Sequence, residues 1–164
     1  MTSNFLILCT HNSARSILAE AMLNHLAARQ GCEVHGYSAG SAPSGTVNPL
    51  ALATLSAAGI DVSQLRSKSW DEFGLPGAPR FRAVITVCDN AAKETCPLYP
   101  GSPMRIHWGY PDPSSVTGDE PTRLAAFEVT RQAIGYRMLQ LVRLRMNELD
   151  DAGLRAALLK ISAS

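Results

Sequence analysis

Short apolar runs alternate along the chain with longer stretches in which apolar residues recur every three or four positions. Runs typical of strands cover residues 4–8, 32–40, 82–88 and 104–108. Helical spacing covers residues 16–31, 49–58 and 122–149, with Gly135 as a weak point in the last. Strands that alternate with helices predict right-handed βαβ units. We therefore expect an α/β fold: a single domain over residues 1–149 with a four-stranded parallel sheet and helices on both faces, followed by a C-terminal amphipathic extension over residues 150–164.

Length, charge and cysteine content narrow the functional class. A chain of 164 residues fits one domain. The net charge of +1 argues against nucleic-acid binding, and we expect the basic residues Arg137, Arg143 and Arg145 to form a solvated helix face. No apolar run approaches the roughly 18 residues of a membrane span, and the N-terminus lacks the basic start of a signal peptide. We therefore expect a cytoplasmic protein with no membrane partner, whose four cysteines are thiols.

The stretch CTHNSAR joins the first predicted strand to the first predicted helix. Backbone N–H groups that turn inward at such a junction form an anion cradle, and Arg15 adds a planar fork for two oxygens of an oxyanion. A helix N-terminus and a nearby arginine also lower the pKa of a thiol, so Cys9 is the candidate nucleophile. The alternative is a buried cysteine beside a surface arginine. The expected substrate-binding residues are those of the loop and the position after it: Thr10, His11, Asn12, Ser13, Ala14, Arg15 and Ser16.

CTHNSARS resembles the Cys-x5-Arg-Ser phosphate loop of the low-molecular-weight protein tyrosine phosphatase fold, and within that fold it is closer to the arsenate reductase branch. The similarity runs from Asn4 to about Leu149. The resemblance implies a phosphotyrosine phosphatase I-like sheet, an Asn12 that ties down the loop, and a Ser16 that bonds the thiolate. We expect His11 to be a rim residue without a catalytic role.

Cys88 and Cys96 lie eight positions apart at the end of the third predicted strand, in VITVCDNAAKETCPLYPG. This stretch resembles the redox segment of arsenate reductases, which implies that the two thiols supply two electrons as they form a disulfide. Two alternatives remain: inert packed thiols, or half of a zinc site. Zinc ligand pairs usually lie two to four residues apart and no second pair is present, so we expect no metal. Cys32 has no partner motif, and we expect it to be a packed strand residue.

DNAAKET, between the two cysteines, predicts a short helix with an N-cap at Asp89 or Asn90 while the thiols are reduced. A disulfide needs its Cα atoms about 4.4–6.8 Å apart, and a helix of this length does not allow that separation. Oxidation is therefore expected to unwind the helix and move the segment outward.

HWGYPDPSS places Asp112 before a proline, where the phosphatase family keeps its general acid. The proline favours an extended turn that can hold the carboxyl group over the cradle. Tyrosine-specific members commonly have aromatic residues just after this Asp-Pro, whereas this chain has Ser114 and Ser115. Some reductases of the family bind potassium near the loop, but the corresponding region offers Lys68, so we expect no potassium site.

Together these features predict an arsenate reductase that uses Cys9, Cys88 and Cys96 as a relay, with phosphate or sulfate as substrate mimics. No bound cofactor is expected, and the external reductant is thioredoxin, or glutaredoxin with glutathione. The alternatives are a tyrosine phosphatase that uses only Cys9, Arg15 and Asp112, and a non-catalytic sensor of oxyanions or arsenite. The sequence does not determine the oligomeric state; a monomer is the expectation.

Overall fold

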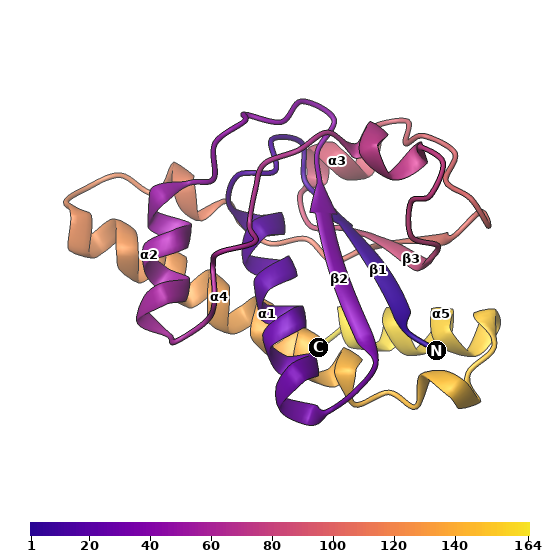
Figure 1. Cartoon of the computed structure of the whole chain (residues 1–164). Coiled ribbons are helices and arrows are strands. Elements are labelled where there is room, and N and C mark those ends of the chain that lie inside the picture. Colours follow the sequence, from indigo (N-terminus) through magenta and orange to yellow (C-terminus); the bar gives the residue numbers. More distant parts are fainter.

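The computed structural model describes residues 1–164 and contains one four-stranded parallel sheet (Figure 1). Its strands are β1 (Ser3–Leu8), β2 (Val34–Ala39), β3 (Phe81–Thr86) and β4 (Met104–His107), in the order β2-β1-β3-β4. The chain leaves β1 toward one edge of the sheet and later returns to its other side, so the order reverses between β1 and β3. This finding confirms the α/β prediction, and it places a ligand crevice at the carboxyl ends of these two strands.

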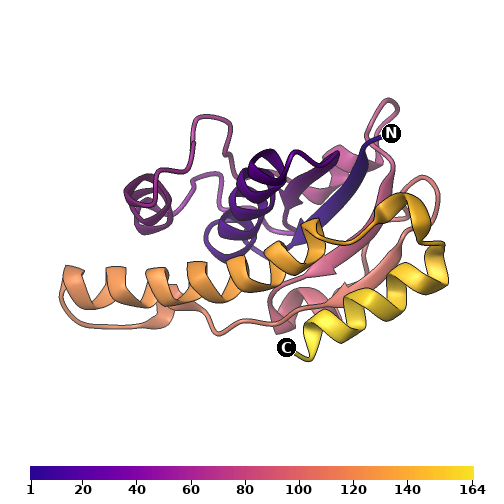
Figure 2. The same cartoon turned by 90° about the horizontal axis from the view of Figure 1, so that it is seen from below.

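Five α-helices and three short 3-10 helices connect and cover the strands. The α-helices are α1 (Arg15–Gln30), α2 (Pro49–Ala57), α3 (Asp89–Lys93), α4 (Glu120–Val142) and α5 (Asp151–Ser162). The 3-10 helices are η1 (Trp70–Gly74), η2 (Pro113–Ser115) and η3 (Met146–Glu148). Figure 2 shows α4 as the long orange helix that begins at one end of the molecule, with α5, in yellow, near its C-terminal end. None of these helices combines the length and the apolar sequence that crossing a membrane requires.

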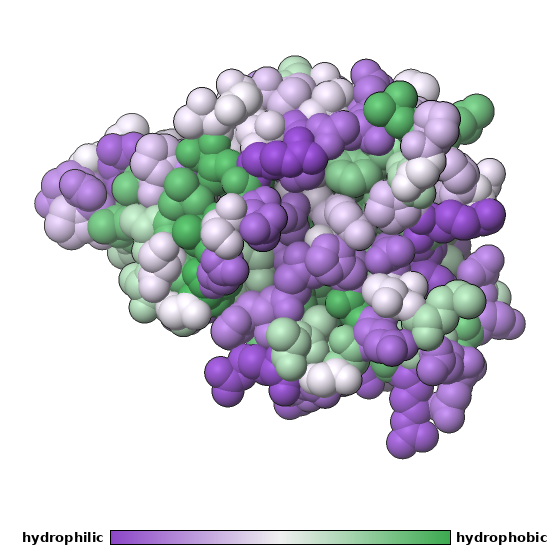
Figure 3. All heavy atoms as spheres, in the orientation of Figure 1, coloured by the Kyte–Doolittle hydropathy of each residue, from purple (hydrophilic) through white to green (hydrophobic).

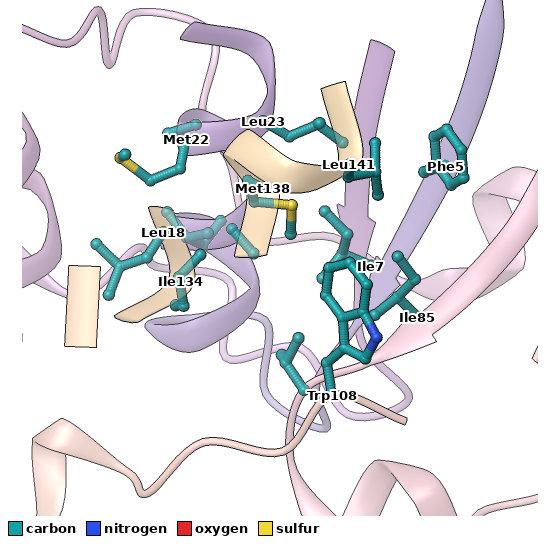
Figure 4. Close-up of a cluster of buried hydrophobic side chains, with 14 of the residues drawn as sticks. Phe5, Ile7, Leu18, Met22, Leu23, Ile85, Trp108, Ile134, Met138 and Leu141 are labelled. Atoms are coloured by element: carbon teal, nitrogen blue, oxygen red, sulfur yellow. The ribbon is translucent and has the colours of Figure 1, made fainter. Parts of the chain in front are cut away.

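The main core lies between one face of the sheet and helices α1, α4 and α5. Figure 4 shows Ile7 and Ile85 of the sheet facing Leu18 of α1 and Ile134 of α4. Trp108, just after β4, is fully buried in this core, and its indole N–H donates to the Leu158 carbonyl of α5 at 3.1 Å. The apolar side of α5, made by Leu154, Leu158 and Ile161, belongs to the same core. The residues expected as a C-terminal extension therefore pack as part of the domain.

The opposite face of the sheet is covered by η1 and by the loop after α3. Phe73 of η1, Phe81 and Tyr99 pack against Leu6 and Val84 there, with edge-to-face ring contacts at centroid distances of 5.6 to 6.2 Å. On the face shown in Figure 3, a group of apolar residues lies over α2, beside surface that is largely polar.

The last long helix differs from its prediction in extent and continuity. It ends at Val142 rather than Leu149, because the Arg82 guanidinium of β3 binds the carbonyls of Met146, in η3, and of Leu149, just after η3, at 3.2 and 3.1 Å. Gly135 does not weaken it. A Cβ at that position would lie 2.8 Å from the Met22 methyl group, the flexible end of a side chain of α1.

The prediction of a solvated basic face holds for Arg143 and Arg145, which are exposed, and is wrong for Arg137. The Arg137 guanidinium lies 4.9 Å from the Tyr110 ring centroid and donates to the Ser162 carbonyl at 3.1 Å. Helical spacing did not indicate this burial, because both contacts come from distant parts of the chain.

Candidate active site

A cleft of about 720 Å³ opens at the carboxyl ends of β1, β3 and β4. The loop after β1, the segment after β3 and the Asp-Pro turn after β4 meet in it, because the carboxyl ends of parallel strands share one edge of the sheet. The predicted site residues that line it are Cys9, Thr10, His11, Ser13, Ala14, Arg15, Cys88 and Asp112. Asn12 and Ser16 lie beneath the loop, fully buried.

The Cys9–Arg15 loop is shaped by Asn12 and by the end of β2. Asn12 has a left-handed backbone with φ of 45°, which asparagine tolerates better than most residues. Its side chain donates to the Ser16 and Ser38 hydroxyls at 2.8 and 3.0 Å and accepts from the Lys68 N–H at 2.9 Å. Gly40 has no room for a side chain, because a Cβ would collide with the backbone carbonyls of the loop. Asn12 therefore ties down the loop, as its resemblance to the family implied.

A buried ion pair supports this network from below. The Lys68 ammonium lies 3.5 Å from Glu20 Oε1 of α1, and the two side chains are 7% and 10% exposed. Glu20 also accepts from the Ser38 hydroxyl at 2.7 Å, and Lys68 donates to the Arg66 carbonyl at 3.0 Å. Burial lowers the pKa of Lys68 below its ordinary value, while Glu20 acts in the opposite direction. The Lys68 ammonium thus places a positive charge beneath the loop, where it is paired with Glu20.

Arg15 is held by the loop that follows β4. Its Nη1 donates to the Tyr110 carbonyl at 2.9 Å, and its Nη2 lies 3.6 Å from the Asp112 carboxylate. Asp112 also accepts from the Ser114 N–H and hydroxyl at 2.9 and 2.7 Å, as the N-cap of η2. These contacts fix the planar guanidinium at the cleft and place a carboxyl group beside it.

The thiols of Cys9 and Cys88 line the same cleft at the ends of neighbouring strands, and each affects the pKa of the other. The interaction with Cys9, helped by the Thr10 and Ala91 amides, lowers the pKa of Cys88 below its ordinary value, although burial opposes the shift. The same interaction with Cys88, together with burial, raises the pKa of Cys9 above its ordinary value, whereas Arg15 lowers it.

The segment after Cys88 forms the expected short helix, α3, but its N-cap was predicted wrongly. Cys88 rather than Asp89 or Asn90 occupies the cap, because its sulfur accepts from the Ala91 N–H at 3.4 Å. The Arg105 guanidinium of β4 fastens the other end by donating to the Glu94 carbonyl at 2.9 Å and to the Ala91 carbonyl.

Cys96 does not reach the cleft in this structure. Its side chain packs against the apolar cluster on the opposite face of the sheet, beside Tyr99, whereas Cys9 and Cys88 belong to the main core. Burial raises the pKa of the Cys96 thiol. All four cysteines are free thiols, so Cys96 has to move before it can react with Cys88.

Several residues of the site had no signal in the sequence. Glu94 accepts from the Thr10 hydroxyl at 2.9 Å and from the Ser41 hydroxyl, and Asn90 donates to Thr10 at 2.9 Å. These partners lie 53 to 84 positions apart for Glu94 and 80 for Asn90, and no short motif encodes such pairs.

The remaining predicted residues lie at the edge of the site or away from it. His11 is exposed at the rim, where its Nδ1 lies 3.5 Å from the Ala42 carbonyl. Cys32 packs against the core just before β2 and donates to the Val142 carbonyl at 3.5 Å. No three His, Cys, Asp or Glu side chains converge in a way that could hold a metal ion.

Known proteins are similar to this chain in amino-acid sequence and in fold. The sequence model of the low molecular weight phosphotyrosine protein phosphatase family matches residues 4–152. A curated protein of Bacillus licheniformis named arsenate reductase is 40% identical over 132 residues, which cover 80% of this chain and 88% of that protein.

Two solved structures extend the likeness to three dimensions. The crystal structure of an arsenate reductase from Archaeoglobus fulgidus is 26% identical, with a TM-score of 0.63, and the match covers 84% of this chain and 98% of that one. A thioredoxin-dependent arsenate reductase of Corynebacterium glutamicum is 25% identical, with a TM-score of 0.54, and the match covers 87% of this chain and 64% of that one.

Proposed function

The chain belongs to the low molecular weight phosphotyrosine protein phosphatase family, and on that premise we propose that it is an arsenate reductase, which converts arsenate to arsenite. One observation carries the proposal: Cys88 lines the same cleft as Cys9. Phosphate-ester hydrolysis needs the nucleophile Cys9, Arg15 and an acid, but no second thiol. Reduction of arsenic by two electrons needs two thiols, which supply the electrons as they form a disulfide. The likeness to the arsenate reductase of Bacillus licheniformis supports the same reading.

The first step forms a bond between sulfur and arsenic. Arsenate binds to the Cys9–Arg15 loop, where Arg15 contacts two of its oxygens and the first-turn N–H groups of α1 face its charge. An oxyanion bound beside Arg15 favours the thiolate form of Cys9, which attacks arsenic. Asp112 lies beside Arg15 and donates a proton to the departing oxygen, which leaves as water.

The second step transfers the electrons. The Cys88 thiolate attacks the sulfur of Cys9, a sulfur–sulfur bond forms, and the electron pair of the sulfur–arsenic bond stays on arsenic, which leaves as arsenite. Cys96 then attacks Cys88 and displaces Cys9, so the Cys88–Cys96 disulfide remains. Because Cys96 packs on the opposite face of the sheet, this last step requires α3 to unwind.

An external dithiol completes the cycle by reducing the Cys88–Cys96 disulfide. Thioredoxin is the reductant we propose, supported by the likeness to the thioredoxin-dependent enzyme of Corynebacterium glutamicum; glutaredoxin with glutathione is the alternative. Such a cycle fits a cytoplasmic location, where thiols are kept reduced. It uses no bound cofactor.

A single comparison tests the function. The purified protein is supplied with arsenate, thioredoxin, thioredoxin reductase and NADPH, and NADPH consumption and arsenite are measured. A parallel sample receives p-nitrophenyl phosphate. Arsenite production that depends on Cys88 supports the reductase. Aryl-phosphate hydrolysis without arsenite production identifies a phosphatase, and binding of arsenite without either reaction identifies a sensor.

A further inference from the structure

Glu94 connects three loops of the site from a position just after α3. Its side chain is half-buried, and its two carboxylate oxygens have different partners. Oε1 accepts from the Thr10 hydroxyl at 2.9 Å, and Oε2 accepts from the Ser41 hydroxyl. Thr10 follows Cys9 after β1, and Ser41 follows the end of β2. One carboxylate therefore fastens the Cys88–Cys96 segment to the loop that holds the nucleophile.

The hydrogen bonds of Thr10 show where its one hydroxyl hydrogen points. Asn90 Nδ2 donates to Thr10 Oγ1 at 2.9 Å, so this oxygen is already an acceptor. The hydrogen itself has two acceptors within reach: Glu94 Oε1 at 2.9 Å and the Cys88 sulfur at 3.9 Å. A carboxylate is a stronger acceptor than sulfur, and here it is also nearer. The hydrogen therefore points to Glu94 and away from Cys88.

We propose that Glu94 is a positioning residue for Cys88: it holds the Thr10 hydrogen away from the Cys88 sulfur while the segment is closed over the cleft. A thiolate that receives fewer hydrogen bonds is more basic and more nucleophilic. Glu94 thus keeps Cys88 reactive for its attack on Cys9, a purpose that rests on the thiol relay proposed above.

The same contacts link this effect to motion of the segment. Glu94 belongs to the stretch that must unwind before Cys96 can approach Cys88, so unwinding withdraws the carboxylate from Thr10 and Ser41. The Thr10 hydroxyl is then free to turn toward sulfur. Closure of the segment and high reactivity of Cys88 therefore occur together.

Alkylation of Cys88 tests the proposal without any arsenate turnover, so a failure here is distinct from a failure of the proposed function. In a Cys9→Ser, Cys96→Ser background, iodoacetamide reacts with Cys88 across a pH series, and peptide mass spectrometry separates it from Cys32. Glu94→Asp keeps the charge but shortens the side chain, and Glu94→Leu removes the acceptor. In both we expect the midpoint of the profile to move to lower pH and the plateau rate to fall about two- to threefold, because Thr10 now donates to the thiolate.

Two comparisons separate this role from a merely structural one. In a Thr10→Val background, Glu94→Asp should change neither midpoint nor plateau. Lys93→Gln, at an exposed neighbouring position, should leave the profile as in the parent protein. A loosened segment would raise the plateau rate instead of lowering it. An unchanged profile in both Glu94 variants, or the same change with and without the Thr10 hydroxyl, would overturn the proposal.

Discussion

Cys9 and Cys88 line one cleft at the carboxyl ends of β1 and β3. They lie together because β1 and β3 are neighbouring strands, with Leu8 paired to Thr86, and each cysteine follows its strand closely. Each thiol thereby affects the proton affinity of the other. The nucleophile and the second thiol of the proposed relay form one electrostatic unit.

This coupling predicts that Cys88→Ala lowers the pKa of Cys9. The interaction with Cys88 is the largest cause that raises it, and the variant leaves Arg15 to act only against burial and the Asp112 carboxylate. The pH midpoint for alkylation of Cys9 by iodoacetamide should fall, so more Cys9 thiolate is present at neutral pH. Cys96→Ser is the matched control, since Cys96 packs on the opposite face of the sheet and should leave the midpoint in place. A midpoint that stays the same or rises in Cys88→Ala would show that the two thiols are not coupled.

Arg15→Lys should reduce turnover of arsenate by about two to three orders of magnitude. A lysine keeps the charge but cannot both donate to the Tyr110 carbonyl and present a planar pair of donors to an oxyanion. Steady-state kinetics with arsenate is the measurement, and Cys9→Ser, which removes the nucleophile, sets the zero level. Turnover close to wild type in either variant would refute the assignment of the cleft.

Lys68→Met should destabilise the fold by about 3–5 kcal/mol, because Glu20 is left buried without its ion-pair partner. Urea denaturation measures the free energy of unfolding. Adding Glu20→Gln should restore part of the loss, since the second change removes the unpaired charge. The exposed pair of Arg66 and Glu72 offers a control, and Arg66→Gln should cost about 1 kcal/mol or less. Equal losses in Lys68→Met and Arg66→Gln would contradict the supporting role of the buried pair.

Oxidation should expose the backbone of α3. The helix has only five residues and depends on the Cys88 cap and on Arg105, so little stability opposes its unwinding. Amides from Ala91 to Thr95 should exchange hydrogen for deuterium faster in the Cys88–Cys96 disulfide form than in the reduced protein. Arg105→Gln should increase exchange in the reduced protein as well. If protection of these amides is the same in both redox states, the segment does not open.

The sequence predicted those parts of the site that depend on neighbouring residues. Cys9, Arg15 and Asn12 lie within one loop between a strand and a helix, and Asp112 is held by its own Asp-Pro turn, so local patterns sufficed. The sheet followed from apolar runs for the same reason. The short helix after Cys88 was also local, although its cap was assigned to the wrong residue because a sulfur acceptor is rare at that position.

Features that depend on residues far apart in the sequence could not be predicted from local patterns. The end of α4 depends on Arg82 of β3, which binds carbonyls 64 and 67 positions away. The pairing of Glu94 with Thr10, 84 positions apart, and of Lys68 with Glu20, 48 positions apart, arises only when the strands assemble. Both pairs contain charged side chains, and composition alone places these at the surface.

The most direct test of the relay is a single-turnover measurement of arsenite release without any external reductant. Reduced Cys96→Ser and Cys88→Ser proteins are each mixed with excess arsenate, and arsenite is quantified per protein molecule. Cys96→Ser should release one arsenite, because Cys9 and Cys88 together supply both electrons. Cys88→Ser should release none, since no other thiol lines the cleft beside Cys9. Arsenite release by Cys88→Ser at the level of Cys96→Ser would contradict the account.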